Sequence, residues 1–230
     1  KIRFCATSAT RDATNRDLFI EGVFERLGIR PEVISGDEEA RLSFMGATKD
    51  LPASDGPFLV VDIGGGSTEF VFGTSTVESA KSVNIGCVRM SERHFTGDQP
   101  DPGQIASAIE DIDEAIRQAA KSVPITQAKT VIMVAGTATT VAAAALDLPA
   151  YDRYAIHLAR ISAERAHEIS TELLRETREQ RAAHGYMHPG RVDVIGAGSL
   201  VLDRIMLATG ASEFVASESD ILDGMAWSLV

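Results

Sequence analysis

The sequence feature that most constrains the fold is segment 58–72, which contains an apolar run, a carboxylate, three consecutive glycines and a second apolar run. After the glycines, polar and apolar residues alternate and β-forming side chains are frequent, which predicts a strand. The segment therefore predicts a β-hairpin whose turn is formed by Gly64, Gly65 and Gly66. A Walker loop or a dinucleotide-binding loop would instead lead into a helix.

This turn has the chemistry of a phosphate-binding loop. Glycines permit positive φ angles and let backbone N–H groups approach an anion closely, and Ser67 adds a hydroxyl donor. Asp62, at the end of the first strand, can hold a hydrated Mg²⁺ ion or orient a water. The alternative is a tight hairpin without a ligand, but three glycines cost conformational entropy that a plain hairpin has no reason to bear.

Length and composition limit the class of protein. With 230 residues, the chain can bury a substantial core as one large domain or two smaller ones. Its net charge of −11 argues against a nucleic-acid-binding protein, because such proteins usually present a basic face. No stretch of 18 or more apolar residues occurs, so we expect no membrane partner. Cys5 and Cys87 lack metal-site spacing and are too few for a disulfide framework, which favours a reducing, cytoplasmic setting.

Predicted strands and helices alternate along the chain, which indicates an α/β protein. Apolar periodicity predicts helices at 16–27, 87–95, 102–121, 162–183 and 219–230, and strands at 2–7, 32–34, 58–63, 68–73, 79–85 and 213–216, with a further strand beginning at 130. In the first of these helices, Leu18, Phe19 and Phe24 are expected on the buried side. Segment 51–57 is rich in turn-forming residues and marks the expected domain boundary.

A further helix is predicted to follow Ser35. Ser35 and Glu38 have the spacing of a capping box, in which the Glu38 side chain reaches back to the start of the helix. Glu39 is then left without a structural role, unless both glutamates simply favour the positive end of the helix.

Several motifs together resemble the exopolyphosphatase and guanosine pentaphosphate phosphohydrolase (Ppx/GppA) family. These motifs lie at 6–15, 34–42, 61–69, 134–137, 191–195 and 220–225, in the order found in the family. The resemblance covers essentially the whole chain and implies the actin-like ATPase fold, in which two ribonuclease-H-like domains flank a cleft. It places residues 1–50 and 215–230 in the first domain and residues 57–214 in the second.

One departure from the family pattern affects the expected first domain. Family members carry an earlier hairpin, Asp-x-Gly-[ST]-Asn-Ser, which supplies the other half of the phosphate clamp. The sequence does not contain this hairpin and begins without a methionine, so we expect an incomplete first domain whose N-terminal part is missing. We therefore expect the 230-residue chain by itself to release little phosphate.

The resemblance also implies roles for individual carboxylates and an arginine. Glu39 matches the catalytic glutamate of the family and is the expected general base. Asp62 and Glu69 are expected to hold Mg²⁺. Glu69 is also expected to be a catalytic residue. The alternative is that Glu69 is a solvent-exposed residue on its strand. Arg11 is expected to contact phosphoryl oxygens, or else to be a surface arginine near a helix cap.

Further residues are expected to bind the substrate. Gly64, Gly65, Gly66 and Ser67 would hold the terminal phosphate through backbone and hydroxyl donors. Gly136 and Thr137 would line the cleft, although a buried strand-to-helix turn could use the same residues. Arg191 would hold the phosphate chain further from the bond that is cut.

The expected activity is Mg²⁺-dependent hydrolysis of the terminal phosphoanhydride of inorganic polyphosphate, with release of orthophosphate. Removal of the 5′ phosphate of guanosine pentaphosphate is the first alternative, since it needs the same catalytic groups. A non-catalytic polyphosphate- or nucleotide-binding module of the same fold is the second. A homodimer is a further expectation taken from the family.

Overall fold

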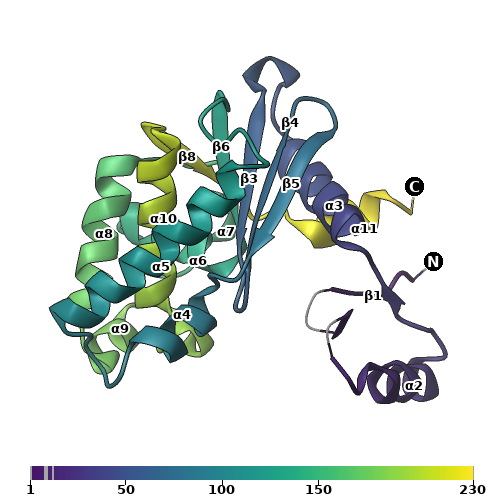
Figure 1. The fold of residues 1–230 in the computed structure, drawn as a ribbon, viewed down its shortest axis with the longest axis horizontal. Coiled ribbons are helices and arrows are strands. Elements are labelled where there is room, and N and C mark those ends of the chain that lie inside the picture. Colours follow the sequence, from purple (N-terminus) through teal and green to yellow (C-terminus); the bar gives the residue numbers. More distant parts are fainter. Residues whose placement is uncertain (1, 8–9, 12, 230) are drawn as a thin grey trace.

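The computed structural model describes residues 2–7, 10–11 and 13–229, and strands alternate with helices as the sequence predicts (Figure 1). Its main sheet has six strands in the order β5-β4-β3-β6-β8-β7. These strands are β3 (Phe58–Ile63), β4 (Thr68–Gly73), β5 (Val77–Val83), β6 (Thr130–Val134), β7 (Arg160–Ser162) and β8 (Glu213–Ala216). β3 is antiparallel to β4 and parallel to β6, so it occupies the centre of the sheet.

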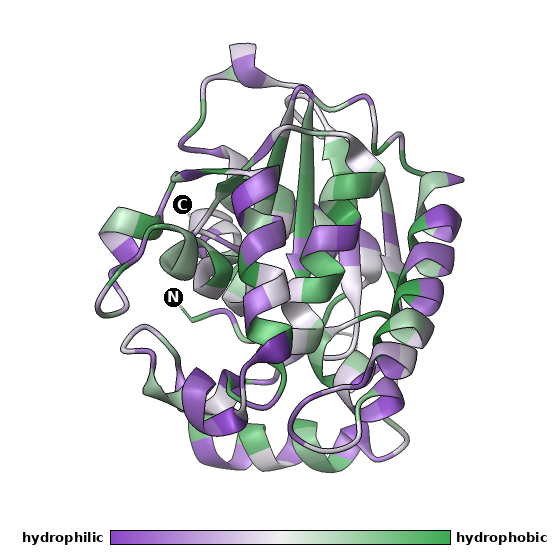
Figure 2. Cartoon of the chain, turned by 90° about the vertical axis from the view of Figure 1, so that its left-hand side faces the viewer, coloured by the Kyte–Doolittle hydropathy of each residue, from purple (hydrophilic) through white to green (hydrophobic). Residues whose placement is uncertain are grey.

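Helices cover both faces of this sheet. One face carries α4 (Cys87–His94), α5 (Pro102–Ala120), α6 (Ala135–Ala145), α7 (Arg153–Ile156), α8 (Ala163–Arg175), α9 (Arg178–Ala183) and α10 (Ile195–Thr209), and the other α3 (Gly36–Thr48) and α11 (Ile221–Trp227) (Figure 1). The short helices η1 (Ala53–Asp55) and η2 (Pro189–Arg191) lie in connections. Figure 2 shows the largely hydrophobic strands between helices that carry both hydrophilic and hydrophobic residues.

The central strand is buried on both faces, which explains its continuous apolar run. Leu59 and Val61 belong to the large core under α5, α8 and α10, whereas Phe58 and Val60 pack with Phe44 of α3. Successive side chains of a strand point to opposite faces, so a strand between two helical layers is apolar at nearly every position. The sheet thereby fixes the position of the turn that follows β3.

Residues 2–7, 10–11 and 13–33 form a separate small unit, and one prediction there was wrong. β1 (Cys5–Ala6) and β2 (Glu32–Val33) pair in parallel beside α2 (Arg16–Leu27), away from the main sheet (Figure 1). No residue of α2 is buried; Leu18 is 76% exposed and Phe19 43% exposed. Two strands of two residues each present too little surface to cover the apolar side of a three-turn helix.

Two helix boundaries differ from the predictions. The helix expected at 162–183 is two helices, because the chain breaks before Thr177, whose side chain forms a capping box with Gln180. The last helix begins at Ile221, after Asp220 accepts a hydrogen bond from the Leu222 N–H. In both places a local cap decides the boundary, and apolar periodicity carries little information about it.

A close crossing of α3 and α11 ties the N-terminal part of the chain to its C-terminal end. A Cβ atom at Gly46 would overlap the backbone carbonyl of Asp220, and one at Gly224 would overlap the carbonyl of Leu42. Only glycine permits this approach of the two backbones. The crossing holds α3 against the main sheet and therefore positions the residues at its start.

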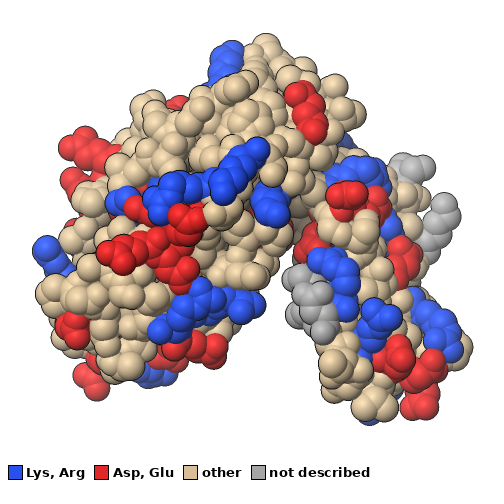
Figure 3. All heavy atoms as spheres, viewed as in Figure 1, with Lys and Arg blue, Asp and Glu red and all other residues tan. Residues whose placement is uncertain are grey.

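The structure also bears on the expectations from composition. Cys5 and Cys87 are free thiols. Within the described ranges, no helix is both long enough and apolar enough to cross a membrane. Acidic and basic side chains are interspersed over the face of the molecule seen in Figure 3.

Candidate active site

A cavity of about 650 Å³ lies between the β3–β4 turn and the start of α3. It brings together predicted site residues from three segments, namely Arg11, Glu39, Asp62, Gly64, Gly65, Gly66, Ser67 and Glu69. Figure 3 shows the molecule hollowed between the part that carries α2 and the main body. The cavity receives Arg11 from the first part and the glycine turn from the second.

The glycine turn closes the predicted hairpin and leaves three of its N–H groups without a partner among the described residues. The Gly64 N–H donates to the Ser67 carbonyl at 3.0 Å, and the Gly64 and Gly65 carbonyls accept from the first turn of α4. The N–H groups of Gly65, Gly66 and Ser67 donate to no other described residue. Successive unpaired backbone N–H groups in a turn form an anion-binding concavity, so the turn can hold a phosphate.

Asp62 and Glu69 form a carboxylate pair beside this turn. They are register partners on β3 and β4, and cross-strand neighbours lie within contact distance. Burial raises the pKa of Asp62 to about 7, and the negative charges of Glu69, Asp220 and Glu39 act in the same direction. Two carboxylates at close range are oxygen donors of the kind that a divalent cation takes.

Glu69 is half-buried in the cavity wall rather than solvated on an exposed strand. The Ser82 hydroxyl donates to its carboxylate at 2.7 Å, since Ser82 is its register partner on β5. Burial raises the pKa of Glu69, while hydrogen bonds from Ser67 and Ser82 oppose the shift. The carboxylate is therefore held in one orientation beside Asp62.

The donor set suits Mg²⁺ better than a metal that needs an all-protein cage. Among the residues that the structure describes, no group of three or more His, Cys, Asp or Glu side chains is arranged to hold a metal ion. Mg²⁺ commonly takes one or two carboxylates, several waters and substrate phosphates. Asp62 and Glu69 match that requirement, because both are oxygen donors and both line the cavity.

Glu39 lies in the first turns of α3 and contacts Arg11. The Arg11 Nη1 atom is 3.3 Å from the Glu39 carboxylate and also donates to the Ile34 carbonyl at 2.8 Å.

The capping box predicted at the start of α3 is half correct. The Ser35 hydroxyl accepts a hydrogen bond from the Glu38 N–H, but the Glu38 carboxylate does not return to the helix start.

Glu38 is instead held by two arginines. Its carboxylate pairs with Arg41 at 2.8 Å and with Arg3 at 3.2 Å. The hydrogen bond from Arg41 contributes most to lowering the pKa of Glu38 to about 2. The two adjacent glutamates therefore differ, because Glu38 is neutralised outside the cavity and Glu39 lines it.

The remaining predicted residues line a second, smaller cavity. Gly136, Thr137 and Arg191 surround a space of about 210 Å³ that shares Gly64 and Gly65 with the first cavity. The Arg191 guanidinium lies so close to Gly136 that a Cβ atom there would overlap it. Arg191 donates to the Thr140 hydroxyl at 3.0 Å and has no acidic partner among the described residues.

Sequence reasoning missed several residues of the first cavity, namely Thr7, Ser43, Ser82, Asn84, Arg89 and Ile221. Arg89 donates to the Gly66 carbonyl at 2.6 Å, an interaction that depends on how α4 packs on the turn. The register of β5 on β4 brings Ser82 beside Glu69. In the sequence, only the alternation of polar residues along β5 indicated that Ser82 could face the site. Thr7 and Ile221 lie within the motifs at 6–15 and 220–225, but no role was assigned to them, and no local pattern marks Ser43 or Asn84.

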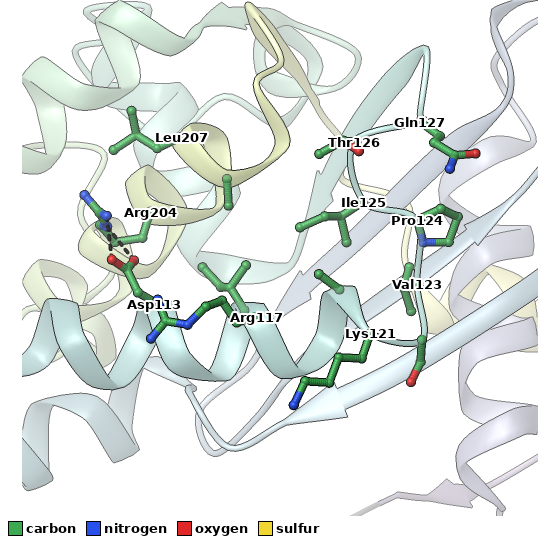
Figure 4. A pocket seen from close by; sticks show the side chains of 14 residues that line it. Asp113, Arg117, Lys121, Val123, Pro124, Ile125, Thr126, Gln127, Arg204 and Leu207 are labelled. Carbon is green, nitrogen blue, oxygen red and sulfur yellow. Dashed lines mark hydrogen bonds and ion pairs between the residues drawn. The ribbon is translucent and has the colours of Figure 1, made fainter.

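Another cavity of about 650 Å³ lies between α5, segment 121–127 and α10 (Figure 4). Arg204 and Asp113 form a bidentate pair there, with distances of 2.8 and 2.7 Å. The Arg117 guanidinium pairs with Glu114. None of the predicted site residues lines this cavity, and it contains no glycine turn and no unpaired carboxylate.

Comparison with known proteins decides the family. The model described as the Ppx/GppA phosphatase family matches residues 1–230. The chain belongs to this family. Exopolyphosphatase 2 of Mycobacterium tuberculosis is 43% identical over 238 residues, which cover 100% of this chain and 75% of that protein. The resemblance drawn from the motifs is confirmed.

Solved structures of relatives confirm the α/β, actin-like ATPase fold. The crystal structure of an exopolyphosphatase-like protein superposes with a TM-score of 0.94 at 44% identity, covering 100% of this chain and 77% of that one. The Ppx/GppA enzyme of Aquifex aeolicus gives a TM-score of 0.86 at 26% identity, covering 98% and 74%. The division into residues 1–50 with 215–230 and residues 57–214 stays a prediction.

Proposed function

We propose that the protein is an exopolyphosphatase that hydrolyses the terminal phosphoanhydride of inorganic polyphosphate and releases orthophosphate with the help of Mg²⁺. One observation carries the proposal: unpaired N–H donors of the glycine turn and the carboxylates of Glu39, Asp62 and Glu69 line one cavity. Donors can hold a phosphoryl group, and carboxylates can accept a proton or bind a cation. The 43% identity to an exopolyphosphatase supports the same substrate class.

The proposed reaction needs positioning more than covalent chemistry. The N–H groups of Gly65, Gly66 and Ser67 bind the oxygens of the terminal phosphoryl group. A water attacks phosphorus in line with the bond to the rest of the chain, and Glu39 accepts one of its protons. The phosphoanhydride P–O bond breaks, and its electron pair leaves with the shortened polyphosphate.

Charge neutralisation is divided among several groups. Asp62 and Glu69 would hold Mg²⁺, which when bound offsets negative charge on the phosphoryl oxygens. Arg11 anchors the Glu39 carboxylate through its contact at 3.3 Å and can extend its remaining N–H groups to the substrate.

The second cavity favours polyphosphate over guanosine pentaphosphate. Its volume of about 210 Å³ is small for a nucleoside, and none of its lining residues is aromatic. Arg191 supplies a cation that suits the next phosphates of a linear chain. Hydrolysis of guanosine pentaphosphate is therefore the second candidate, and a non-catalytic binding module is the third.

The decisive variant is Glu39→Gln in the full-length protein, assayed for phosphate release from polyphosphate and from guanosine pentaphosphate. Loss of a general base lowers kcat by roughly 10²–10⁴-fold, and the circular dichroism spectrum should stay unchanged. Glu38→Gln is the matched control, because the adjacent carboxylate lies outside the cavity and pairs with Arg41.

Three outcomes would contradict the proposal. Substantial turnover by Glu39→Gln would remove Glu39 from the role of general base. A higher kcat/KM for guanosine pentaphosphate than for polyphosphate would favour the second candidate. Saturable polyphosphate binding by the wild-type protein without phosphate release would favour the binding module.

A further inference from the structure

Ser43 on α3 has a buried hydroxyl that the rest of the protein does not satisfy. The residue is 4% exposed, and its Oγ atom has no hydrogen-bond partner among the described residues. Hydroxyl side chains in helices commonly bond to the carbonyl four residues earlier. Thr48 does so with Phe44 at 2.8 Å, and Thr140 does so with Gly136 at 2.7 Å. Ser43 does not form this bond.

The position of Ser43 suggests what its partner is. Ser43 follows Glu39 by four residues on the same helix, so both side chains lie on one face. Both also line the cavity that contains the glycine turn and Asp62. A buried hydroxyl without a partner is costly, and Ser43 borders the cavity, so turning its side chain about χ1 would let a molecule bound there supply the missing hydrogen bond.

We propose that Ser43 is a positioning residue for the attacking water. This inference rests on the proposed function. The Ser43 Oγ atom accepts one hydrogen of the water while Glu39 accepts the other, which leaves a lone pair of the water oxygen free to attack phosphorus. In the reaction, one proton passes to Glu39 and the other stays on the new orthophosphate, where Ser43 Oγ still accepts it. Ser43 therefore contacts the nucleophile before the reaction and the product after it.

Ser170 provides a matched control within the same chain. It lies in α8, is 1% exposed and also has an unpartnered Oγ atom among the described residues. It does not line the cavity between the glycine turn and α3. A buried, unpaired helix serine is thus present at both positions, and only Ser43 lies beside Glu39.

The experiment compares Ser43→Ala, Ser43→Thr and Ser170→Ala in the full-length protein. For each we would measure kcat and KM for polyphosphate with Mg²⁺, the calorimetric Kd of orthophosphate with Mg²⁺, and Tm. We expect Ser43→Ala to lower kcat by roughly 10–100-fold with KM within about twofold, because the water loses its fixed orientation. Its Kd for orthophosphate should rise by roughly fivefold, the effect of losing one ordinary hydrogen bond.

Stability separates this role from a structural one. Ser43→Ala and Ser170→Ala each remove an unsatisfied buried hydroxyl, so both should keep or raise Tm. Ser170→Ala should leave kcat and Kd unchanged, and Ser43→Thr should recover part of kcat because it keeps the hydroxyl.

If Ser43→Ala kept the kcat and the orthophosphate Kd of the wild-type protein, the proposed role of Ser43 would be overturned. A fall in kcat that is accompanied by a fall in Tm would also overturn it. Absence of phosphate release by the wild-type protein would instead overturn the proposed function. In that case the orthophosphate Kd still decides whether Ser43 contacts a phosphate: an unchanged Kd overturns the contact and a raised Kd supports it.

Discussion

The two cavities on either side of the glycine turn share Gly64 and Gly65 but differ in charge. The larger one, of about 650 Å³, contains the carboxylates of Glu39, Asp62 and Glu69. The smaller one, of about 210 Å³, contains the cation of Arg191 and no carboxylate. The larger cavity is also lined by Arg11, which pairs with Glu39, and by Arg89. A single turn thus separates a site with three carboxylates and two arginines from a site with one arginine and no carboxylate.

If the proposed polyphosphate substrate spans both cavities, this difference predicts a division of roles along it. A polyanion enters a carboxylate-lined cavity only if a cation or the turn's N–H groups offset the repulsion. An unpaired arginine attracts the same polyanion without further help. We therefore expect the larger cavity to govern kcat and the smaller one to govern KM, and the following predictions test that separation in order of expected effect.

The largest effect is expected in the larger cavity. Asp62→Asn should lower kcat by roughly 100-fold or more, because a metal ligand contributes several kcal/mol to charge stabilisation in the transition state. KM should change little. Phosphate release at saturating polyphosphate measures kcat, and Asp55→Asn, ahead of the same strand, is the control. An Asp62→Asn enzyme that loses only substrate affinity would break the division of roles.

A smaller effect on the kinetics is expected in the smaller cavity, which contains Arg191. Arg191→Ala should raise KM for polyphosphate by roughly tenfold and leave kcat within about twofold, because a charge-assisted hydrogen bond to phosphate is worth about 1.5–3 kcal/mol. Arg191→Lys should show a weaker defect, since it keeps the charge. Arg117→Ala on α5 is the control for loss of a surface cation. A fall in kcat at constant KM would place Arg191 in the chemical step.

The smallest effect concerns stability and pH. Folded Asp62 keeps its proton up to about pH 7, whereas an unfolded aspartate ionises near about pH 4. The folded state therefore binds the extra proton between these values, so Asp62 contributes stability that is lost as pH rises towards about 7. Each kcal/mol lost lowers Tm by roughly 2–4 °C.

This stability prediction is checked by thermal scans of metal-free protein from about pH 4 to about pH 8. Asp62→Asn should flatten the decline of Tm, and Mg²⁺ should raise the wild-type Tm more at about pH 8 than at about pH 5, because it binds the ionised carboxylate. Equal Mg²⁺ stabilisation of wild type and Asp62→Asn would argue against Asp62 as a ligand.

Elements with strong local patterns were predictable from the sequence. The hairpin of β3 and β4 formed as expected, since glycines and alternating β-formers act over a few residues. The break before Thr177 was missed because a cap interrupts a continuous helical pattern. The burial of α2 was wrong, because the apolar stripe of a helix says nothing about whether a partner surface lies opposite it.

The sequence by itself determined the α/β class, the glycine turn and the carboxylates that border it. These features depend on local backbone preferences and on residue chemistry, which act between near neighbours in the chain. Only the tertiary structure decided that Glu39 and Asp62 share a cavity while Arg191 lies across the turn, and that Ser43 stands unpaired beside Glu39. Those placements follow from strand register and from the glycine crossing of α3 with α11, which join segments far apart in the sequence.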